Sequence, residues 1–184
     1  MKLEGSEKEG VIVRTLVVLA MILLAAALRI APHPWNLTPV GAMALFSGAM
    51  VRDRRLAFLF PLLALFAGDL VIGLHTLMPW VYASFLVNVA LGNWLRSRPT
   101  PARIGAITLL GAIQFFVITN FSVWATYDTY PRTASGLVAC YIAGIPYFWN
   151  TLAGDFLYAA LLFGGFAIAV RLVPSLRLPT VAVR

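Results

Sequence analysis

The sequence predicts an all-α, polytopic integral membrane protein with six transmembrane helices and with both termini in the cytoplasm. The prediction rests on composition, on the lengths of the apolar segments and on the placement of the basic residues. Of the 184 residues, 61% are hydrophobic and 11% are charged, whereas a typical soluble domain has about 45–50% and about 25%. A soluble chain of this length could not bury so much apolar surface, so we expect lipid to be its solvent.

Apolar segments give the number of helices. Four of them reach the roughly 17–25 residues that a helix needs to cross a bilayer, at residues 11–28, 56–72, 104–124 and 152–172. The first exceeds the roughly 7–15 apolar residues of a signal peptide, so we expect it to be retained. Two shorter segments, 38–51 and 79–95, are also apolar and carry no charge. Residues 136–149 are aromatic and contain Pro146, so we expect a loop or an interfacial segment there.

The basic residues give the orientation. With the N-terminus in the cytoplasm, twelve of the fourteen Lys and Arg residues fall on the inner side, and two, Arg29 and Arg132, on the outer side. Cytoplasmic loops are enriched in Lys and Arg, so we expect a multi-pass protein of the cell inner (cytoplasmic) membrane. We expect one transmembrane domain, 1–184, with a short cytoplasmic leader at 1–10 and a cytoplasmic tail at 173–184. The cations are not gathered on one face, which argues against binding to nucleic acid.

Helix starts are predicted at the outer side of the membrane. Thr38 is a suitable N-cap and Pro39 suits the first helical position, where a missing N–H has no cost. Pro79 has the same role in the fourth segment, and Asn150 or Thr151 is expected to cap the sixth. Each such helix end would present free N–H groups and about half a positive charge to the outer space.

Small and polar residues at helical spacing predict close packing between helices. Ser84, Asn88 and Gly92 lie four residues apart on one stripe, and Gly48 follows an alanine at the same spacing. Such stripes let helices approach closely in lipid. Gln114, near the middle of its segment, is expected to form a hydrogen bond between helices. Asn88 could instead contact a ligand.

Polar and ionisable residues that the topology does not explain gather toward the outer side. An Asp at the centre of a membrane helix costs roughly 2.5–3.5 kcal/mol on insertion scales, so such residues should face the bundle interior or an aqueous cavity. We therefore expect a substrate-binding site made of Arg29, His33, Asn36, Asp69, His75, Asn120, Trp124, Asn150 and Asp155. As alternatives, Arg29 is an outer anchor, the aspartates are structural partners of Arg29 and Arg132, and the nearby aromatic residues form an interfacial belt.

The chain resembles a known family over nearly its whole length. The resemblance is clearest in four stretches: "RIAPHPWNLTPVGAMALFSGA", "PLLALFAGDLVIGLH", "FFVITNFSVW" and "GIPYFWNTLAGDFLY". They resemble an uncharacterised family of small bacterial membrane proteins described as putative transport proteins. The expected architecture is similar to that of the S component of energy-coupling-factor (ECF) transporters. That resemblance implies capture of a vitamin, a vitamin precursor or a metal ion in an outward-facing cavity. It also implies docking onto a membrane coupling protein with ATPase subunits; a solitary transporter is the alternative.

Motifs for other functions are absent from the sequence. There is no Walker GxxxxGK[ST] motif, and there is no HExxH, GxSxG or paired-Asp metal motif. The one cysteine, Cys140, is expected to be a small buried side chain. We therefore expect a substrate-binding membrane transport protein that is not an enzyme, with no catalytic residue, cofactor or metal centre. An assembly or scaffold subunit of a membrane complex and an integral membrane enzyme are the alternatives.

Overall fold

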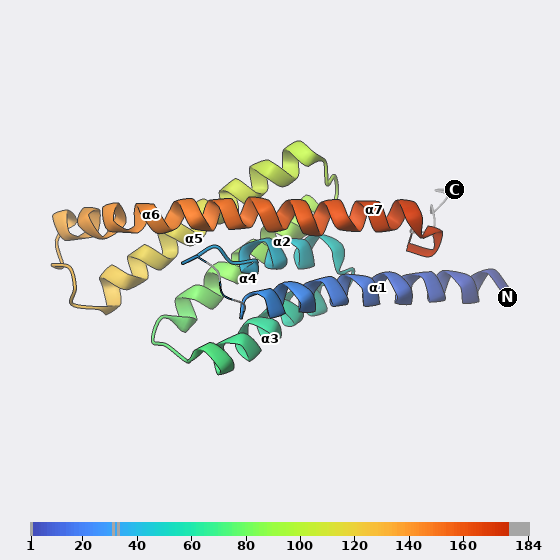
Figure 1. Ribbon diagram of the computed structural model, residues 1–184, viewed down its shortest axis with the longest axis horizontal. Coiled ribbons are helices and arrows are strands. Elements are labelled where there is room, and N and C mark those ends of the chain that lie inside the picture. Colours follow the sequence, from blue (N-terminus) through green and yellow to red (C-terminus); the bar gives the residue numbers. More distant parts are fainter. Residues whose placement is uncertain (1, 31, 33, 177–184) are drawn as a thin grey trace.

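The computed structural model describes residues 2–30, 32 and 34–176, and every regular element in this part of the chain is a helix (Figure 1). The helices are α1 (Lys2–Leu28), α2 (Val40–Met50), α3 (Arg54–Ile72), α4 (Met78–Leu95), α5 (Pro101–Thr126), α6 (Ala134–Ala159), a π-helical segment at Ala160–Gly164, α7 (Gly165–Leu172) and a 3-10 turn at Pro174–Leu176. The all-helical class predicted from the sequence is confirmed.

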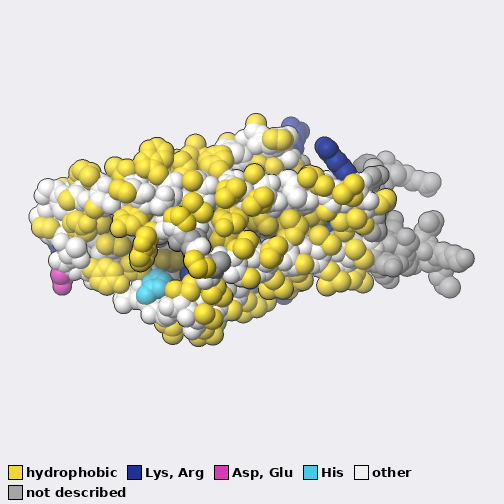
Figure 2. Space-filling view, viewed as in Figure 1, with side chains coloured by type: hydrophobic (Ala, Val, Ile, Leu, Met, Phe, Trp, Pro, Cys, Tyr) yellow, Lys and Arg dark blue, Asp and Glu magenta, His cyan; other side chains and the backbone are white. Residues whose placement is uncertain are grey.

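Four helical stretches are long and apolar enough to cross a membrane: Gly10–Leu28, Arg54–Ile72, Pro101–Thr126 and Ala134–Leu172. Their mean hydropathy lies between 1.8 and 2.7, and only 17–33% of the residues in their most apolar windows are buried inside the protein. The remaining apolar side chains therefore face outward. Figure 2 shows the result, a surface dominated by hydrophobic side chains.

Residues 136–149 are helical, so the expectation of a loop there was wrong. They belong to one continuous helical stretch, Ala134–Leu172, that contains Pro146. A proline removes one backbone hydrogen bond, but membrane helices tolerate it because neighbouring groups satisfy the freed carbonyl. The N-cap is Thr133, whose hydroxyl accepts a hydrogen bond from the N–H of Gly136 at 3.1 Å. Asn150 and Thr151 therefore lie within the helix and do not cap it.

Helix starts elsewhere follow the prediction more closely. α4 begins at Met78, so Pro79 lies in its first turn but at the second helical position, one residue away from the prediction. α2 begins at Val40, one residue later than expected, with Pro39 at the N-cap and no hydrogen bond from the Thr38 side chain to the helix end. The missing side-chain cap leaves the first N–H groups of α2 available to other partners.

α2 forms the centre of the molecule. Its residues from Val40 to Ala49 are all buried, and in Figure 1 it lies in the interior of the bundle. Its close neighbour is α4: a Cβ on Gly48 would lie 2.0 Å from the Val89 carbonyl oxygen, and a Cβ on Gly92 would lie 2.0 Å from that of Leu45. The interpretation of these glycines as packing residues is confirmed.

A buried polar cluster also joins α4 to α5. Gln114 Nε2 donates to the Ser84 carbonyl oxygen and to Asn88 Oδ1, and the Ser84 hydroxyl donates back to Gln114 Oε1. Gln114 is thus the interhelical hydrogen bonder predicted from the sequence. The cluster holds Asn88 in a fixed orientation.

The connections between helices alternate between two ends of the bundle (Figure 1). Arg96, after α4, donates to the carbonyl oxygen of Arg52, which joins the α2–α3 and α4–α5 connections at one end. The Arg14 guanidinium, on α1, donates to the Leu176 carbonyl oxygen at the same end. At the opposite end lie the connections 29–39, 73–77 and 127–133, where most of the predicted site residues were expected.

Candidate functional site

A cavity of about 150 Å³ lies where the α1–α2 connection meets the start of α2. Side chains and backbone from the connection and from α2, α4, α5 and α6 surround it. They belong to Arg29, Asn36, Thr38, Val40, Gly41, Val81, Phe85, Asn88, Phe115, Thr151 and Asp155. Of the predicted site residues, the structure therefore brings Arg29, Asn36 and Asp155 together around one cavity.

Arg29 is held at the cavity by an ion pair. Its Nη2 donates to Asp69 Oδ1 at 2.5 Å, and its Nη1 donates to the Leu65 carbonyl oxygen at 3.0 Å. The second carboxylate oxygen of Asp69 accepts from the Tyr82 hydroxyl at 2.7 Å. A Cβ on Gly68 would lie 2.8 Å from Arg29 Nη1, so the glycine leaves room for the guanidinium.

The ion pair gives Asp69 a different role from the one predicted. The Asp69 side chain is 2% exposed and does not line the cavity, whereas that of Arg29 is 15% exposed and does. Both carboxylate oxygens of Asp69 are occupied by Arg29 and Tyr82. Asp69 is therefore a structural partner that positions Arg29, which is one of the alternatives left open by the sequence.

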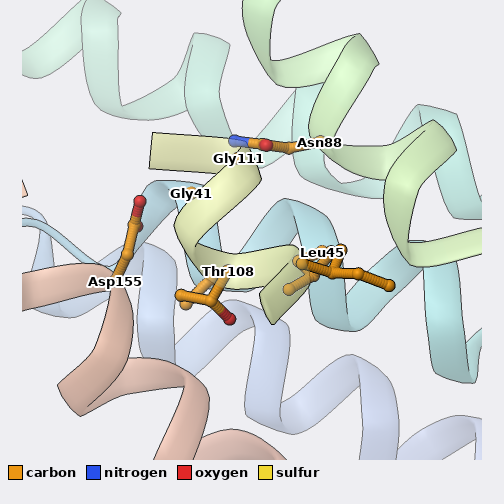
Figure 3. Close-up of a pocket in the computed structure, with 8 residues that line it drawn as sticks. Gly41, Leu45, Asn88, Thr108, Gly111 and Asp155 are labelled. Atoms are coloured by element: carbon orange, nitrogen blue, oxygen red, sulfur yellow. The ribbon is translucent and has the colours of Figure 1, made fainter. Parts of the chain in front are cut away.

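Asp155 is the second ionisable residue on the cavity wall, and it is 4% exposed. It extends from α6 toward the first turn of α2, as Figure 3 shows. A Cβ on Gly41 would lie 2.3 Å from Asp155 Oδ1, so only a glycine fits beside the carboxylate. The backbone N–H of Ala42 faces the same carboxylate. A negative charge at the start of a helix interacts favourably with the helix dipole.

A narrow crevice continues from the cavity into the bundle. It is lined by Gly41, Asn88 and Asp155, which also line the cavity, and by deeper residues such as Thr108 and Gly111 (Figure 3). The crevice has no room for a water molecule. The Thr108 hydroxyl oxygen is buried there without a hydrogen-bond partner in the described part of the chain. The cavity thus has a closed floor.

Asn36 and Thr38, near the end of the α1–α2 connection, form the roof of the cavity. Asn36 has a φ of +63°, a left-handed conformation that asparagine adopts more readily than most residues. Asn150 Nδ2 donates to the Trp35 carbonyl oxygen at 2.9 Å, and the Thr38 nitrogen lies 3.1 Å from where a Gly154 Cβ would stand. These contacts hold the connection against α6, so Asn150 supports the roof and does not line the cavity.

Asn120, Trp124 and His75 do not join the site. Asn120 packs at the α5–α6 interface, where its Oδ1 would lie 2.3 Å from a Gly144 Cβ. Trp124 donates from Nε1 to the Pro131 carbonyl oxygen at 2.9 Å. His75 is exposed in the α3–α4 connection. His33 lies outside the described residues.

Asn120 and Trp124 were wrongly predicted as site residues because α6 is longer than the sequence suggested. Because this helix starts at Ala134 and not near residue 150, the C-terminal part of α5 packs against Cys140 and Gly144. Eleven residues separate Gly144 from Asp155, which is about 16 Å along a helix. The buried Cys140, whose Sγ donates to the Asn120 carbonyl oxygen, belongs to this α5–α6 interface.

Other cavity residues were not predicted as ligand contacts. The rings of Phe85 and Phe115 form one wall, with centroids 5.3 Å apart. Apolar residues at helical spacing are common in any membrane helix, so no signal in the sequence distinguished these two. The sequence predicted that Asn88 either packs between helices or contacts a ligand. In the structure it accepts a hydrogen bond from Gln114 on the neighbouring helix and also lines the cavity.

Comparisons with known proteins give a family but no characterised relative. Neither the curated proteins nor the solved structures contain a match to this chain. Residues 10–176, which include all the helices that surround the cavity, match the family of unknown function DUF6580. The match covers most of the chain, so this protein belongs to the family of unknown function DUF6580.

Proposed function

We propose that this protein is a membrane transport protein that captures a small solute in the cavity beside α2, as a substrate-binding S component does. The observation that carries the proposal is the cavity, onto whose wall Arg29, Asn36 and Asp155 converge. Ionisable residues inside membrane bundles usually mark substrate or ion pathways. A concave site with a few convergent polar groups is the usual form of a ligand site.

The proposal includes six passes through the inner membrane with both termini in the cytoplasm. The alternation of the connections supports an even number of passes. Arg52, Arg96 and Arg98 lie at the same end of the bundle, and the enrichment of cytoplasmic loops in Arg favours placing that end inside. The cavity then opens toward the outer side. α2 is about 16 Å long, but the helices around it shield it from lipid, so its length need not match the bilayer.

The size of the cavity limits the solute. A cavity of roughly 150 Å³ can hold a molecule of the size of benzene, whereas sites for drug-sized ligands have about 300–1,000 Å³. The proposed substrate is therefore smaller than a complete vitamin, unless the α1–α2 connection moves outward. A metal ion as cargo has less support, because the described residues contain no group of three or more His, Cys, Asp or Glu side chains that could hold one.

Thermal unfolding of the purified protein in detergent tests the proposal. The panel contains small amines, small acids, vitamins, vitamin precursors and divalent metals. A ligand that binds only the folded state stabilises it by about 2.7 kcal/mol at one hundred times its dissociation constant. We expect one class of solute to raise the unfolding temperature.

The matched variant is Asn36→Gly. Glycine adopts the positive φ of this position at no steric cost, so the variant removes the amide from the roof and leaves the backbone conformation available. We expect the variant to fold and to lose most of the ligand-induced stabilisation. If no solute stabilises the wild-type protein, and a partner protein co-purifies with it instead, the chain is an assembly subunit and the proposal is wrong.

A further inference from the structure

The charge of the cavity wall points to a class of solute. Arg29 and Asp155 are the ionisable residues on the described wall. Arg29 is already neutralised by the Asp69 carboxylate at 2.5 Å and donates a further hydrogen bond to the Leu65 carbonyl oxygen. Since this pair has no net charge, Asp155 is the residue of the described wall that can supply a negative charge to a solute.

Asp155 has no such partner in the described part of the chain. The ion pairs there are Arg29–Asp69 and Arg132–Asp128, so no Lys or Arg of the described residues pairs with it. The start of α2 offers the Ala42 N–H and the positive end of the helix dipole. These are partial charges, so they stabilise the carboxylate but do not cancel its formal charge. Burial disfavours an isolated charge, and a cation close to the carboxyl group favours its ionised form.

The aromatic wall is suited to the same kind of ligand. Phe85 and Phe115 line the cavity together with Asp155, and their ring centroids are 5.3 Å apart with the planes tilted by 31°. A cation over the face of an aromatic ring is attracted by the ring quadrupole, and the attraction increases when water is excluded. The Thr38 and Thr151 side chains lie on the same wall.

We propose, on the basis of the binding function proposed above, that the cavity takes a compact organic cation whose ammonium group lies against the Asp155 carboxylate, with its apolar part against Phe85 and Phe115. Asp155 thereby has two partners on opposite sides, the start of α2 and the solute. A solute anion would have to compete with Asp69 for Arg29, and it would lie close to Asp155 without compensation.

The test uses three probes with the same tert-butyl body and different charges: tert-butylammonium, tert-butanol and pivalate. Their dissociation constants are measured by isothermal titration calorimetry on the full chain in detergent at pH 7. We expect tert-butylammonium to bind at least tenfold more tightly than tert-butanol, and pivalate to bind more weakly than either. In Asp155→Asn, which preserves the shape of the side chain and an acceptor for the Ala42 N–H, the preference for the cation should disappear.

Asp128→Asn is the matched control, because it removes an exposed carboxylate at the same end of the bundle but outside the cavity. It should keep the preference for tert-butylammonium. A preference for tert-butanol or pivalate in the wild-type protein would overturn the inference while leaving a solute-binding protein, and that comparison stands even if Asp155→Asn does not fold. A cation preference that survives Asp155→Asn would also overturn it, as would absence of binding by all three probes when another solute in the thermal panel binds.

Discussion

The two ends of α2 meet opposite charges, and the N-terminal end faces the cavity. At the C-terminal end, the Arg96 guanidinium donates to the carbonyl oxygens of Gly48 at 2.7 Å and Val51 at 2.5 Å, and also to that of Arg52. Burial lowers the pKa of Arg96 from its usual value, and the positive charge of Arg54 lowers it further. At the N-terminal end, Asp155 faces the helix on one side and the cavity on the other.

With the function proposed above, the difference separates an end of the helix that serves packing from an end that serves binding. Both charges have the sign that the helix dipole favours. At the Arg96 end, three carbonyl oxygens accept hydrogen bonds from the two terminal nitrogens of the guanidinium, and Gly48 lies directly against the α4 backbone. At the Asp155 end, Gly41 lies against a side chain that can rotate. Substitutions at the first end should therefore affect folding, and substitutions at the second should affect binding.

The largest effect is expected for Gly48→Ala. The new Cβ would lie 2.0 Å from the Val89 carbonyl oxygen, so α2 and α4 would have to separate. Overpacking against backbone should lower the free energy of unfolding by about 3 kcal/mol or more, measured by denaturant unfolding in detergent. Gly164→Ala is the control, since no atom lies within 4 Å of its added Cβ. Equal stability of the two variants would show that α2 and α4 are not in close contact.

Arg96→Met should have the next largest effect. Methionine keeps much of the apolar stem but leaves the carbonyl oxygens of Gly48, Val51 and Arg52 without their charged donor. We expect the free energy of unfolding to fall by about 2–3 kcal/mol, with binding of tert-butylammonium unchanged. A loss of binding without a loss of stability would mean that the two ends of α2 are not distinct in function.

Gly41→Ala should have the opposite result, a loss of binding that exceeds the loss of stability. Its Cβ would lie 2.3 Å from Asp155 Oδ1, and the carboxylate can move only by leaving its place at the start of α2. We expect binding of tert-butylammonium to weaken about tenfold, which corresponds to about 1.4 kcal/mol, with a smaller loss of stability than in Gly48→Ala. Gly105→Ala is the control, because its added Cβ would make an ordinary contact with Phe156 at 3.7 Å.

Asp128→Asn should have the smallest effect. Asp128 forms an exposed ion pair with Arg132 at 3.4 Å, and exposed pairs contribute little to stability. Neither the unfolding temperature nor the binding of tert-butylammonium should change measurably. A clear effect on binding would indicate that the α5–α6 connection takes part in the site, as the sequence had predicted for its neighbour Trp124.

The fold class could be predicted from the sequence because lipid imposes simple rules on length and apolarity. The same rules failed for residues 136–149, where Pro146 and the aromatic residues predicted a loop and a helix formed. That error moved Asn120 and Trp124 into the predicted site. Cys140 and Gly144, the partners of Asn120, had not been placed in a helix, and Trp124 donates to the Pro131 carbonyl oxygen just before that helix.

The site could be predicted only in part for a related reason. Arg29, Asn36 and Asp155 are polar residues in apolar surroundings, which gives a signal in sequence. Gly41, Phe85 and Phe115 give none, because glycines and phenylalanines occur throughout membrane helices. Asp69 pairs with Arg29, whereas Asp155 lines the cavity. Which aspartate Arg29 reaches depends on how the helices pack, and the sequence does not reveal it.

Transport as proposed requires that the cavity beside α2 opens to the outer side of the membrane. This requirement is tested most directly by Thr151→Cys in a Cys140→Ala background, treated in intact cells with a small membrane-impermeant methanethiosulfonate. Thr151 lines the cavity, and Arg98→Cys, at the opposite end, is the control. We expect Thr151→Cys to react from outside and Arg98→Cys to react only after permeabilisation. A Thr151→Cys variant that reacts only after permeabilisation, or not at all, would contradict the proposal.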